Sequence, residues 1–387
     1  MRIGIFTDTY DPDINGVVRS ISSLNQALVR NKHEVFIITN HPSIHKIEIR
    51  DRVIRLPGIK LNSLYGYVAS SPVQKRAFEI VRLLSLDIIH VNSVFGIGYF
   101  GRHCGHKLGI PVVFTYHTEF ESYTNYINPL KIKMVDTIGK ITVSKVSKKL
   151  CRTCDAVIAP SRKTRNMLMK YGVSRRIFVV PTGLDIDSFY RFSSNYEDIR
   201  ELRKSFGVKN NELLILYLGR IAPEKSIEIL IDGFKKINQT VLPSKLLIVG
   251  DGPSYQSLKN SIDVSLINSV LFAGQIAMSD VPRYYAASNV FVSPSVTETQ
   301  GLTFIEALAC GLPLFAREDP ALKDVVIENE TGFYFKNSDE LACKLEYYGT
   351  MTDVEKNKIF DKIIKKSREY DLDHFYNSIM DVYQLAE

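Results

Sequence analysis

Short apolar runs alternate with amphipathic stretches along the first half of the chain. Apolar runs bounded by turn residues are typical of strands buried in a parallel sheet. Between them, apolar residues recur at three- and four-residue spacing, as at Val17, Ile21, Leu24 and Leu28, which predicts helices that pack on the sheet. The predicted strands of this half are residues 3–6, 34–39, 87–91, 112–116, 156–160 and 177–181.

The same alternation restarts in the second half, after the polar stretch 187–196. It predicts an α/β protein of two Rossmann-like, doubly wound domains, 1–187 and 188–370, that face a central cleft lined by the carboxyl ends of their strands. After about residue 350 the pattern is helical, with no further strand. The second half's predicted strands are 213–219, 245–250, 270–274, 290–294 and 312–317, with helices at 225–238, 254–262, 279–287 and 302–310.

Composition narrows the class of protein. No apolar run of the 387 residues approaches the roughly 20 residues of a membrane span. The N-terminus turns polar too early for a signal peptide, so we expect a cytoplasmic location. Five cysteines are too few, and odd in number, for a disulfide framework. Cys151 and Cys154 form a C-x-x-C pair without a second Cys or His pair nearby, which favours structural thiols over a zinc or redox site.

Two carboxylates, Glu298 and Glu306, flank the start of an apolar helical run. The N–H groups and the dipole at the start of a helix favour phosphate oxygens, whereas carboxylates accept hydrogen bonds from hydroxyls of sugar or ribose. The segment therefore predicts a binding site for a sugar joined to a diphosphate. Taken alone, the pair also fits the general acid and base of glycoside hydrolysis.

Other polar loops follow predicted strands. Arg220 and Lys225 can converge on a diphosphate, although they also fit solvated cations at a helix end. Gly250 and Gly252 allow an unusual turn beside the ligand, or a purely structural one. In the first half, Gly16 is suited to a close approach by phosphate or sugar and equally to a plain helix entry.

His117 and two acid pairs complete the candidates. His117 ends a predicted strand and can donate to a sugar hydroxyl or a leaving phosphate, but a lone histidine is more often structural. The pairs Asp11/Asp13 and Asp185/Asp187 resemble metal ligands, yet acids of this kind are frequent in turns. We expect no metal site.

Charge separates the two halves. Residues 1–187 hold 27 basic and 14 acidic residues, a net charge of +13, whereas 188–387 hold 22 and 28, a net charge of −6. Cations around a helical apolar pattern favour an interfacial helix on anionic lipid over a solvated basic face. No nucleic-acid-binding motif accompanies the charge. The cations of this stretch are Lys131, Lys133, Lys140, Lys145, Lys148, Lys149 and Arg152.

Together these motifs resemble the retaining glycosyltransferases of family 4, which have the GT-B fold. The resemblance covers nearly the whole chain and rests on Glu298-x7-Glu306, Gly219-Arg220 with Glu224-Lys225, Gly250-Asp251-Gly252-Pro253 and Pro181-x-Gly183-x-Asp185. It places a C-terminal helix of about 371–387 on the first domain. Ser226 stands where many members have Gly, and Asn15-Gly16-Val17 replaces a double glycine.

The resemblance implies a role for each motif residue. Glu298 and His117 contact the sugar, Glu306 holds the ribose, Arg220 and Lys225 neutralise the leaving diphosphate, and no cofactor is required. The expected catalytic residues are His117, Arg220, Lys225 and Glu298. The expected donor-binding residues are Gly16, Arg220, Lys225, Gly250, Gly252, Ile276, Glu298, Thr299, Gln300, Gly301, Leu302 and Glu306.

A narrower resemblance concerns Thr297–Leu302, Tyr116–Ile127 and Asp8–Gly16, which are similar to bacterial diacylglycerol glucosyltransferases. It implies transfer of glucose from UDP-glucose to a diacylglycerol hydroxyl by a monotopic enzyme on the inner face of the cell membrane. The alternatives are a mannosyl- or galactosyltransferase of polysaccharide or teichoic-type polymer synthesis, and an inactive scaffold that binds nucleotide sugar at a membrane surface.

Overall fold

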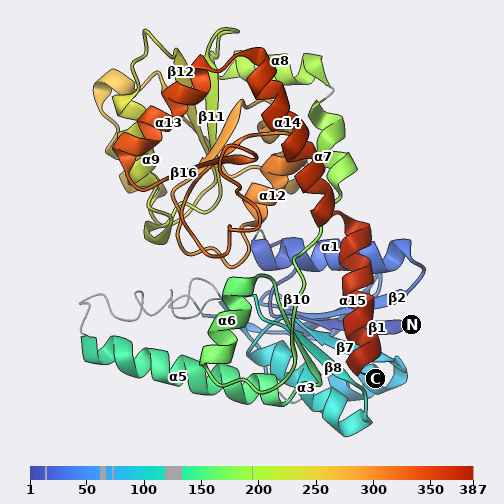
Figure 1. The fold of residues 1–387 in the computed structure, drawn as a ribbon. Helices are drawn as coiled ribbons and strands as arrows, with labels where there is room; N and C mark the ends of the chain where they lie inside the picture. Colours follow the sequence, from blue (N-terminus) through green and yellow to red (C-terminus); the bar gives the residue numbers. More distant parts are fainter. Residues whose placement is uncertain (14, 62–66, 72–73, 118–132, 194, 387) are drawn as a thin grey trace. The chain divides into compact units, whose positions relative to one another are not determined.

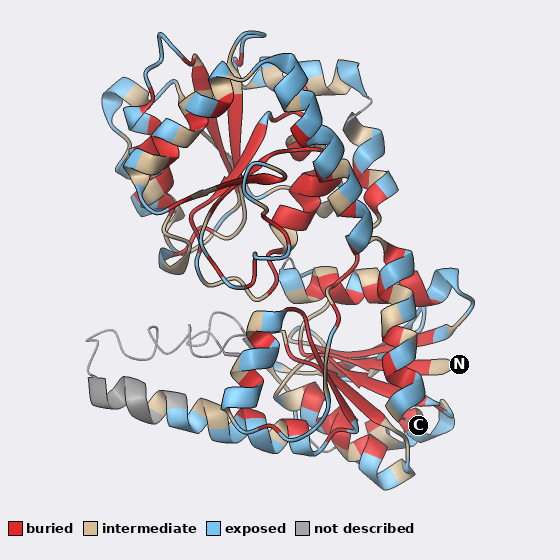
Figure 2. Cartoon of the chain, viewed as in Figure 1, coloured by how far each residue is buried: buried red, intermediate tan, exposed pale blue. Residues whose placement is uncertain are grey.

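The computed structural model describes residues 1–387 except 14, 62–66, 72–73, 118–132, 194 and 387 (Figure 1). The chain forms two compact units: Met1–Gly183 with Leu372–Glu387, and Leu184–Asp371. Each has a parallel sheet whose central strands are buried (Figure 2).

The first unit is built on an eight-stranded sheet. Its strands are β1 (Arg2–Phe6), β2 (Glu34–His41), β3 (Glu48–Arg50), β4 (Val53–Pro57), β7 (Ile88–Val91), β8 (Val112–Thr115), β9 (Ala156–Ala159) and β10 (Ile177–Val179), with β5 (Ile59–Leu61) and β6 (Tyr67–Ala69) paired separately. The order is β10-β9-β8-β7-β1-β2-β4-β3, parallel except for β3. The order of strands reverses between β1 and β7, which makes the carboxyl ends there the expected ligand position.

Helices cover both faces of this sheet. They are α1 (Gly16–Arg30), α2 (Lys75–Leu83), α3 (Gly96–Leu108), α5 (Lys133–Arg152), α6 (Arg162–Lys170) and α15 (Leu372–Ala386). Alternate residues of each strand point to opposite faces. Ile3 and Ile5 therefore join the core under α1 and α15, while Phe6 joins the core under α2, α3, α5 and α6.

The second unit has a six-stranded, fully parallel sheet of order β13-β12-β11-β14-β15-β16. Its strands are β11 (Leu213–Leu218), β12 (Ser244–Val249), β13 (Val270–Gly274), β14 (Val290–Ser293), β15 (Leu314–Arg317) and β16 (Gly332–Phe335). Its helices are α7 (Ile186–Ser193), α8 (Tyr196–Ser205), α9 (Ile227–Lys236), α10 (Tyr255–Asn260), α11 (Val281–Ala286), α12 (Leu302–Ala309), α13 (Ser338–Thr350) and α14 (Asp353–Ser367). Here the order reverses between β11 and β14.

Several elements differ from the sequence prediction. The polar stretch 187–196 is largely helix α7, and Ile186 and Phe189 lie in the core of the second unit. Strands β3 to β6 and β16 were not predicted, and each has only three to five residues. Among the described residues, no helix is long and apolar enough to cross a membrane.

The C-x-x-C pair is buried at the end of α5. Cys151 and Cys154 are 0% and 1% exposed, and burial raises their pKa values to about 12 and about 11. Both thiols therefore stay protonated near neutral pH.

Candidate active site

The candidate donor site of the second unit lies at the point where the strand order reverses. The loop after β11 carries Arg220 and Lys225, and the loop after β14 carries Glu298. β11 and β14 are neighbouring parallel strands, so their carboxyl ends lie at the same edge of the sheet. Open α/β sheets bind ligands at this position.

Lys225 and Glu298 form the central ion pair. The Nζ of Lys225 donates to Oε1 of Glu298 over 2.6 Å and to the hydroxyl of Ser295 over 3.3 Å. Their side chains are only 22% and 14% exposed, so solvent screens this pair less than a surface pair. The structure thus joins two of the predicted catalytic residues directly.

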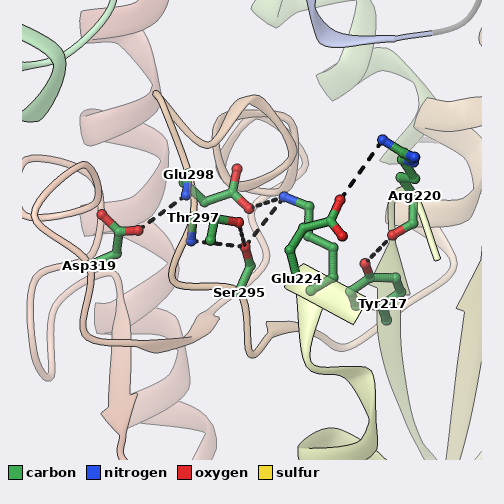
Figure 3. A network of polar contacts seen from close by, with 8 residues as sticks. Tyr217, Arg220, Glu224, Ser295, Thr297, Glu298 and Asp319 are labelled. Atoms are coloured by element: carbon green, nitrogen blue, oxygen red, sulfur yellow. Dashed lines mark hydrogen bonds and ion pairs between the residues drawn. The ribbon is translucent and has the colours of Figure 1, made fainter. Parts of the chain in front are cut away.

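Arg220 lies on the same loop and faces Glu224. Its Nη1 is 3.9 Å from Oε1 of Glu224, and the backbone oxygen of Arg220 accepts a hydrogen bond of 2.9 Å from the hydroxyl of Tyr217 (Figure 3). Burial, followed by the charges of Glu298 and Glu224, raises the pKa of Tyr217 well above its usual value. Tyr217 therefore remains a neutral donor that fixes the loop.

Ser226 has a backbone conformation that favours glycine. It has φ 52° and ψ 40°, a left-handed conformation that links the short helix Pro223–Lys225 to α9. A non-glycine residue adopts this conformation at a cost of about 1–2 kcal/mol. Serine adopts this conformation here, and the cation of Lys225 contacts Ser295 and Glu298 of the loop after β14.

Gly250 and Gly252 lie where two loops touch backbone to backbone. A Cβ atom on Gly250 would be 1.9 Å from the backbone oxygen of Gly219, and one on Gly252 would be 2.2 Å from that of Ile221. The amide of Ile221 also donates to the backbone oxygen of Asp251 over 2.9 Å. The glycines therefore shape the loop that presents Arg220.

Asp319 holds the backbone of Glu298 in place. Its carboxylate is fully buried and accepts hydrogen bonds from the backbone amides of Glu298, over 3.1 Å, and Ala321, over 2.8 Å. Figure 3 shows Asp319 and Glu298 joined in this way. The sequence prediction missed Asp319, although its position just after the strand 312–317 was a usable signal.

The first turn of α12 follows the same loop. Gly301 caps the helix with φ 80°, and a Cβ atom there would lie 2.6 Å from the side chain of Leu322. Thr299 and Leu302 are partly buried, and Gln300 is buried. The start of this helix supplies backbone N–H groups of the kind that bind phosphate.

Glu306 lies one turn further along α12 and is 4% exposed. Its Oε2 accepts a hydrogen bond of 3.0 Å from the hydroxyl of Tyr285, which also donates to the backbone oxygen of Thr303 over 3.0 Å. Tyr285 is fully buried on α11 and reads in the sequence as an ordinary core aromatic, so its part was missed. Ile276, after β13, is partly buried against the core of this unit.

His117 and Gly16 belong to the first unit. His117 follows β8, and its Nε2 lies 2.8 Å from Oδ1 of Asn92, the residue after β7. Burial lowers the pKa of His117 to about 4, which makes the ring neutral near pH 7. Gly16 is exposed at the start of α1, where the side chain of Asn15 accepts from the amides of Val17 and Val18.

The acid pairs of the sequence serve turns and contacts in the structure. Asp13 accepts from the hydroxyl of Thr9 over 2.8 Å. Asp185 accepts from the amide of Ser188 over 3.3 Å, and Asp187 pairs with Arg368 at 2.6 Å.

The predicted membrane-binding cations follow helix α5. Lys145, Lys149 and Arg152 are exposed. Lys148 is also exposed, but a Cβ atom on Gly172 would be 3.0 Å from its Nζ, so it lies beside the C-terminal end of α6. Lys131 and the side chains of Lys133 and Lys140 lie outside the described residues.

Comparisons with known proteins place this geometry in a family. Residues 198–367 match the family model "Glycosyl transferases group 1", and residues 14–188 match "Glycosyltransferase Family 4". The chain is 34% identical over 348 residues to the alpha-monoglucosyldiacylglycerol synthase of Acholeplasma laidlawii, which covers 89% of this chain and 87% of that protein. It is 33% identical to the synthase of the same name from Streptococcus pneumoniae, covering 95% and 83%.

A solved structure agrees with the fold. HepE of Anabaena in complex with UDP and glucose has a TM-score of 0.76 and 18% sequence identity over 99% of both chains. The predicted GT-B fold class is thereby confirmed. The chain belongs to the family 4 glycosyltransferases.

Proposed function

We propose that the protein transfers glucose from UDP-glucose to a hydroxyl of 1,2-diacylglycerol, with retention at the anomeric carbon. The observation that carries the proposal is the partly buried Lys225–Glu298 pair, whose two partners suit a diphosphate and a sugar at one point. The names of the two relatives at 33–34% identity support the lipid acceptor and the glucosyl group. The UDP and glucose bound by HepE support the donor.

In this proposal, charged residues of the second unit bind the diphosphate, the sugar and the ribose of the donor. Lys225 and Arg220 neutralise the diphosphate, and Glu298 accepts hydrogen bonds from sugar hydroxyls. Glu306, oriented by Tyr285, accepts from the ribose hydroxyls. Preorganised cations near the developing negative charge lower the barrier most, because they need no reorganisation during the reaction.

Retention follows a front-face route in this proposal. The bond between the anomeric carbon and the UDP oxygen breaks, and the acceptor oxygen bonds to the same face of the sugar. The acceptor's proton passes to an oxygen of the departing β-phosphate. No protein nucleophile takes part in this route, and Glu298, paired with Lys225, holds the sugar.

The cation pair takes the place of a metal ion in this scheme. We expect turnover to be retained in EDTA, since Arg220 and Lys225 already offset the leaving charge. Loss of turnover in EDTA, with recovery on adding Mg²⁺, would show instead that the diphosphate leaves with a metal.

The first unit meets the membrane surface in this proposal. On the described part of α5, Ile141 and Val146 are 48% and 38% exposed among the basic residues, and on α6 Met169 is 52% exposed. Apolar residues among exposed cations suit the surface of an anionic bilayer. The enzyme would therefore act at the inner face of the cell membrane, where its acceptor resides.

Product analysis tests the function. The protein is incubated with UDP-glucose, UDP-galactose and GDP-mannose together with diacylglycerol in anionic vesicles, and products are identified by mass spectrometry and anomeric NMR. An α-glucosyldiacylglycerol is the expected product. A mannosylated or galactosylated product, or transfer only to soluble or polyprenyl acceptors, would favour a polymer-synthesis enzyme. Absence of any transfer would favour a nucleotide-sugar-binding scaffold.

Vesicle binding tests the membrane part separately. Replacing Lys145, Lys149 and Arg152 with Ser should weaken binding to phosphatidylglycerol vesicles by several kcal/mol, at about 1 kcal/mol per cation. Replacing Lys235, Lys236 and Lys344 of the second unit is the matched control for the loss of three charges. Equal binding by the two triple variants would contradict the assignment to α5.

A further inference from the structure

Two tyrosines of the C-terminal helix α15 each contact a histidine of the first unit. The hydroxyl of Tyr376 lies 2.9 Å from Nε2 of His33, at the partly exposed start of β2. The hydroxyl of Tyr383 lies 2.8 Å from Nδ1 of His90, inside the sheet. The two contacts have the same chemistry, but only the second belongs to the strands that carry the candidate site.

The contact of Tyr383 continues toward that site. Nε2 of His90 lies 2.7 Å from the hydroxyl of Thr115, the last residue of β8. His90 and Tyr383 are both fully buried, and their rings meet edge to face at 5.7 Å. A buried polar group without a partner is costly, so each member of the chain Tyr383–His90–Thr115 fixes the next.

The strand register places Thr115 on the face of His90, two residues before His117 along the chain. His90 pairs with Val113, and side chains two residues apart lie on the same face. Thr115 therefore faces the same side of the sheet as His90, and His117 is the next residue but one after Thr115. α15 packs on this face, as shown by Tyr383 and Val113 in one core.

Asn92 sets which nitrogen of His117 carries hydrogen. The Nδ2 of Asn92 donates to the backbone oxygen of His90 over 3.4 Å, so its Oδ1 is turned toward Nε2 of His117 at 2.8 Å. An amide oxygen only accepts, hence Nε2 of His117 must be the donor. In the neutral ring the other nitrogen, Nδ1, is then an acceptor.

We propose that Tyr383 is a positioning residue that acts through His90 and Thr115 to hold His117, and that His117 presents Nδ1 as an acceptor to a substrate hydroxyl. This inference rests on the proposed function for the identity of the hydroxyl-bearing substrate. It gives the ring of His117 an accepting role, where the sequence suggested donation to a sugar hydroxyl or a leaving phosphate. It also gives the C-terminal helix a part in the reaction beyond filling the core.

Matched substitutions on α15 test the positioning role. Tyr383→Phe and Tyr376→Phe each remove one hydroxyl that contacts a histidine. For Tyr383→Phe we expect kcat to fall about tenfold, the effect of one buried hydrogen bond, with KM for UDP-glucose unchanged. Tyr376→Phe should leave both constants within about twofold. Equal effects of the two variants on kcat would overturn the proposal.

Hydrogen exchange tests the same point without an acceptor. Amides of residues 112–117 should exchange about tenfold faster in Tyr383→Phe than in the wild type or Tyr376→Phe. Unchanged exchange at these residues would also overturn the proposal. Failure of transfer to diacylglycerol by the wild type would refute the proposed function alone, because this measurement does not depend on it.

A second pair covers the case in which Tyr383→Phe does not fold. Thr115→Ser keeps the hydroxyl and should keep kcat within about twofold of the wild type, whereas Thr115→Val keeps the shape and should lose about tenfold. Equal kcat in these two variants would remove Thr115 from the chain and contradict the proposal. Recovery by Ser and not by Val is the result that a purely structural core residue would not give.

Discussion

The candidate sites of the two units lie at similar places but are built from opposite chemistry. One follows β11 and β14, between which the strand order reverses, and the other follows β7 and β8, next to the reversal between β1 and β7. The second unit gathers full charges, with Lys225 and Glu298 2.6 Å apart. The first gathers neutral groups, because burial lowers the pKa values of His90 and His117 to about 3 and about 4.

Under the proposed function, the difference would correspond to the two substrates of a glycosyl transfer. A departing diphosphate gains negative charge and needs cations, whereas an acceptor hydroxyl is neutral and needs an oriented acceptor of hydrogen bonds. The fold therefore supplies the same ligand position twice, and the side chains decide what binds there. Four experiments test this contrast.

Removing the cation of Lys225 should have the largest effect. Lys225→Ala should lower kcat about 10²- to 10³-fold, as expected for loss of a preorganised group at the leaving charge. Lys235→Ala is the control, since Lys235 lies in the last turn of α9 and its pair with Asp263 is about half exposed. Near wild-type kcat in Lys225→Ala would show that the pair serves the fold and not the reaction.

Adding a methyl group where two loops touch should have the second-largest effect. Gly250→Ala places Cβ 1.9 Å from a backbone oxygen, so we expect a loss of about 3 kcal/mol in the free energy of unfolding. Gly274→Ala is the control: its φ is also positive, at 71°, but a Cβ atom there meets nothing within 4 Å. Similar urea midpoints for the two variants would mean that backbone conformation, and not the close contact, is what matters.

Acid should lower the free energy of unfolding through His90, by a smaller amount than the substitution of Gly250. The folded-state pKa of His90, about 3, lies below its ordinary 6.5, so between these values the unfolded chain binds more protons. The stability that His90 contributes is therefore complete above pH 6.5 and is lost as pH falls toward 3. From pH 7 to 5 the loss is about 2 kcal/mol for this group.

Urea unfolding at both pH values measures that loss. His90→Gln should show a pH dependence shallower than the wild type by about 2 kcal/mol, because it removes the titrating ring. A wild-type slope in this variant would mean that other groups account for the acid sensitivity.

The smallest expected effect is on the orientation of Glu306. Tyr285→Phe removes the hydroxyl that contacts Oε2 at 3.0 Å, and one such hydrogen bond is worth about 1 kcal/mol. We expect KM for the nucleotide sugar to rise about fivefold with little change in kcat. Tyr284→Phe, on the same helix, is the control. A selective fall in kcat would move Glu306 from donor binding to the chemical step.

The sequence predicted the charged site better than the neutral one. Glu298, Arg220 and Lys225 stand in turn-rich segments after apolar strands, and Glu306 follows in the next helix, so local chemistry is visible in the residue order. Their assigned roles remain predictions, although the structure joins Lys225 to Glu298.

The sequence analysis missed the neutral residues of the first-unit site because they are far apart in the sequence. His90 contacts Tyr383, 293 positions away, and each residue looks locally like part of an apolar core. Asp319 and Asn92 were accessible in principle, as polar residues that directly follow strands, but neither belongs to a recognised motif. The short strands β3 to β6 were missed because their pairing with neighbouring strands, and not an apolar run in their own sequence, makes them strands.

The membership of α15 in the first unit has a consequence for biosynthesis. Leu372, Phe375, Ile379, Val382 and Tyr383 complete a core whose other members precede residue 184. A nascent chain must therefore be extended through the whole second unit before this face is covered, a delay on the order of ten to forty seconds at bacterial or slower translation rates. Until then α15 does not cover the apolar face of α1 and the ring of His90. The growing first unit is therefore a candidate substrate for chaperones.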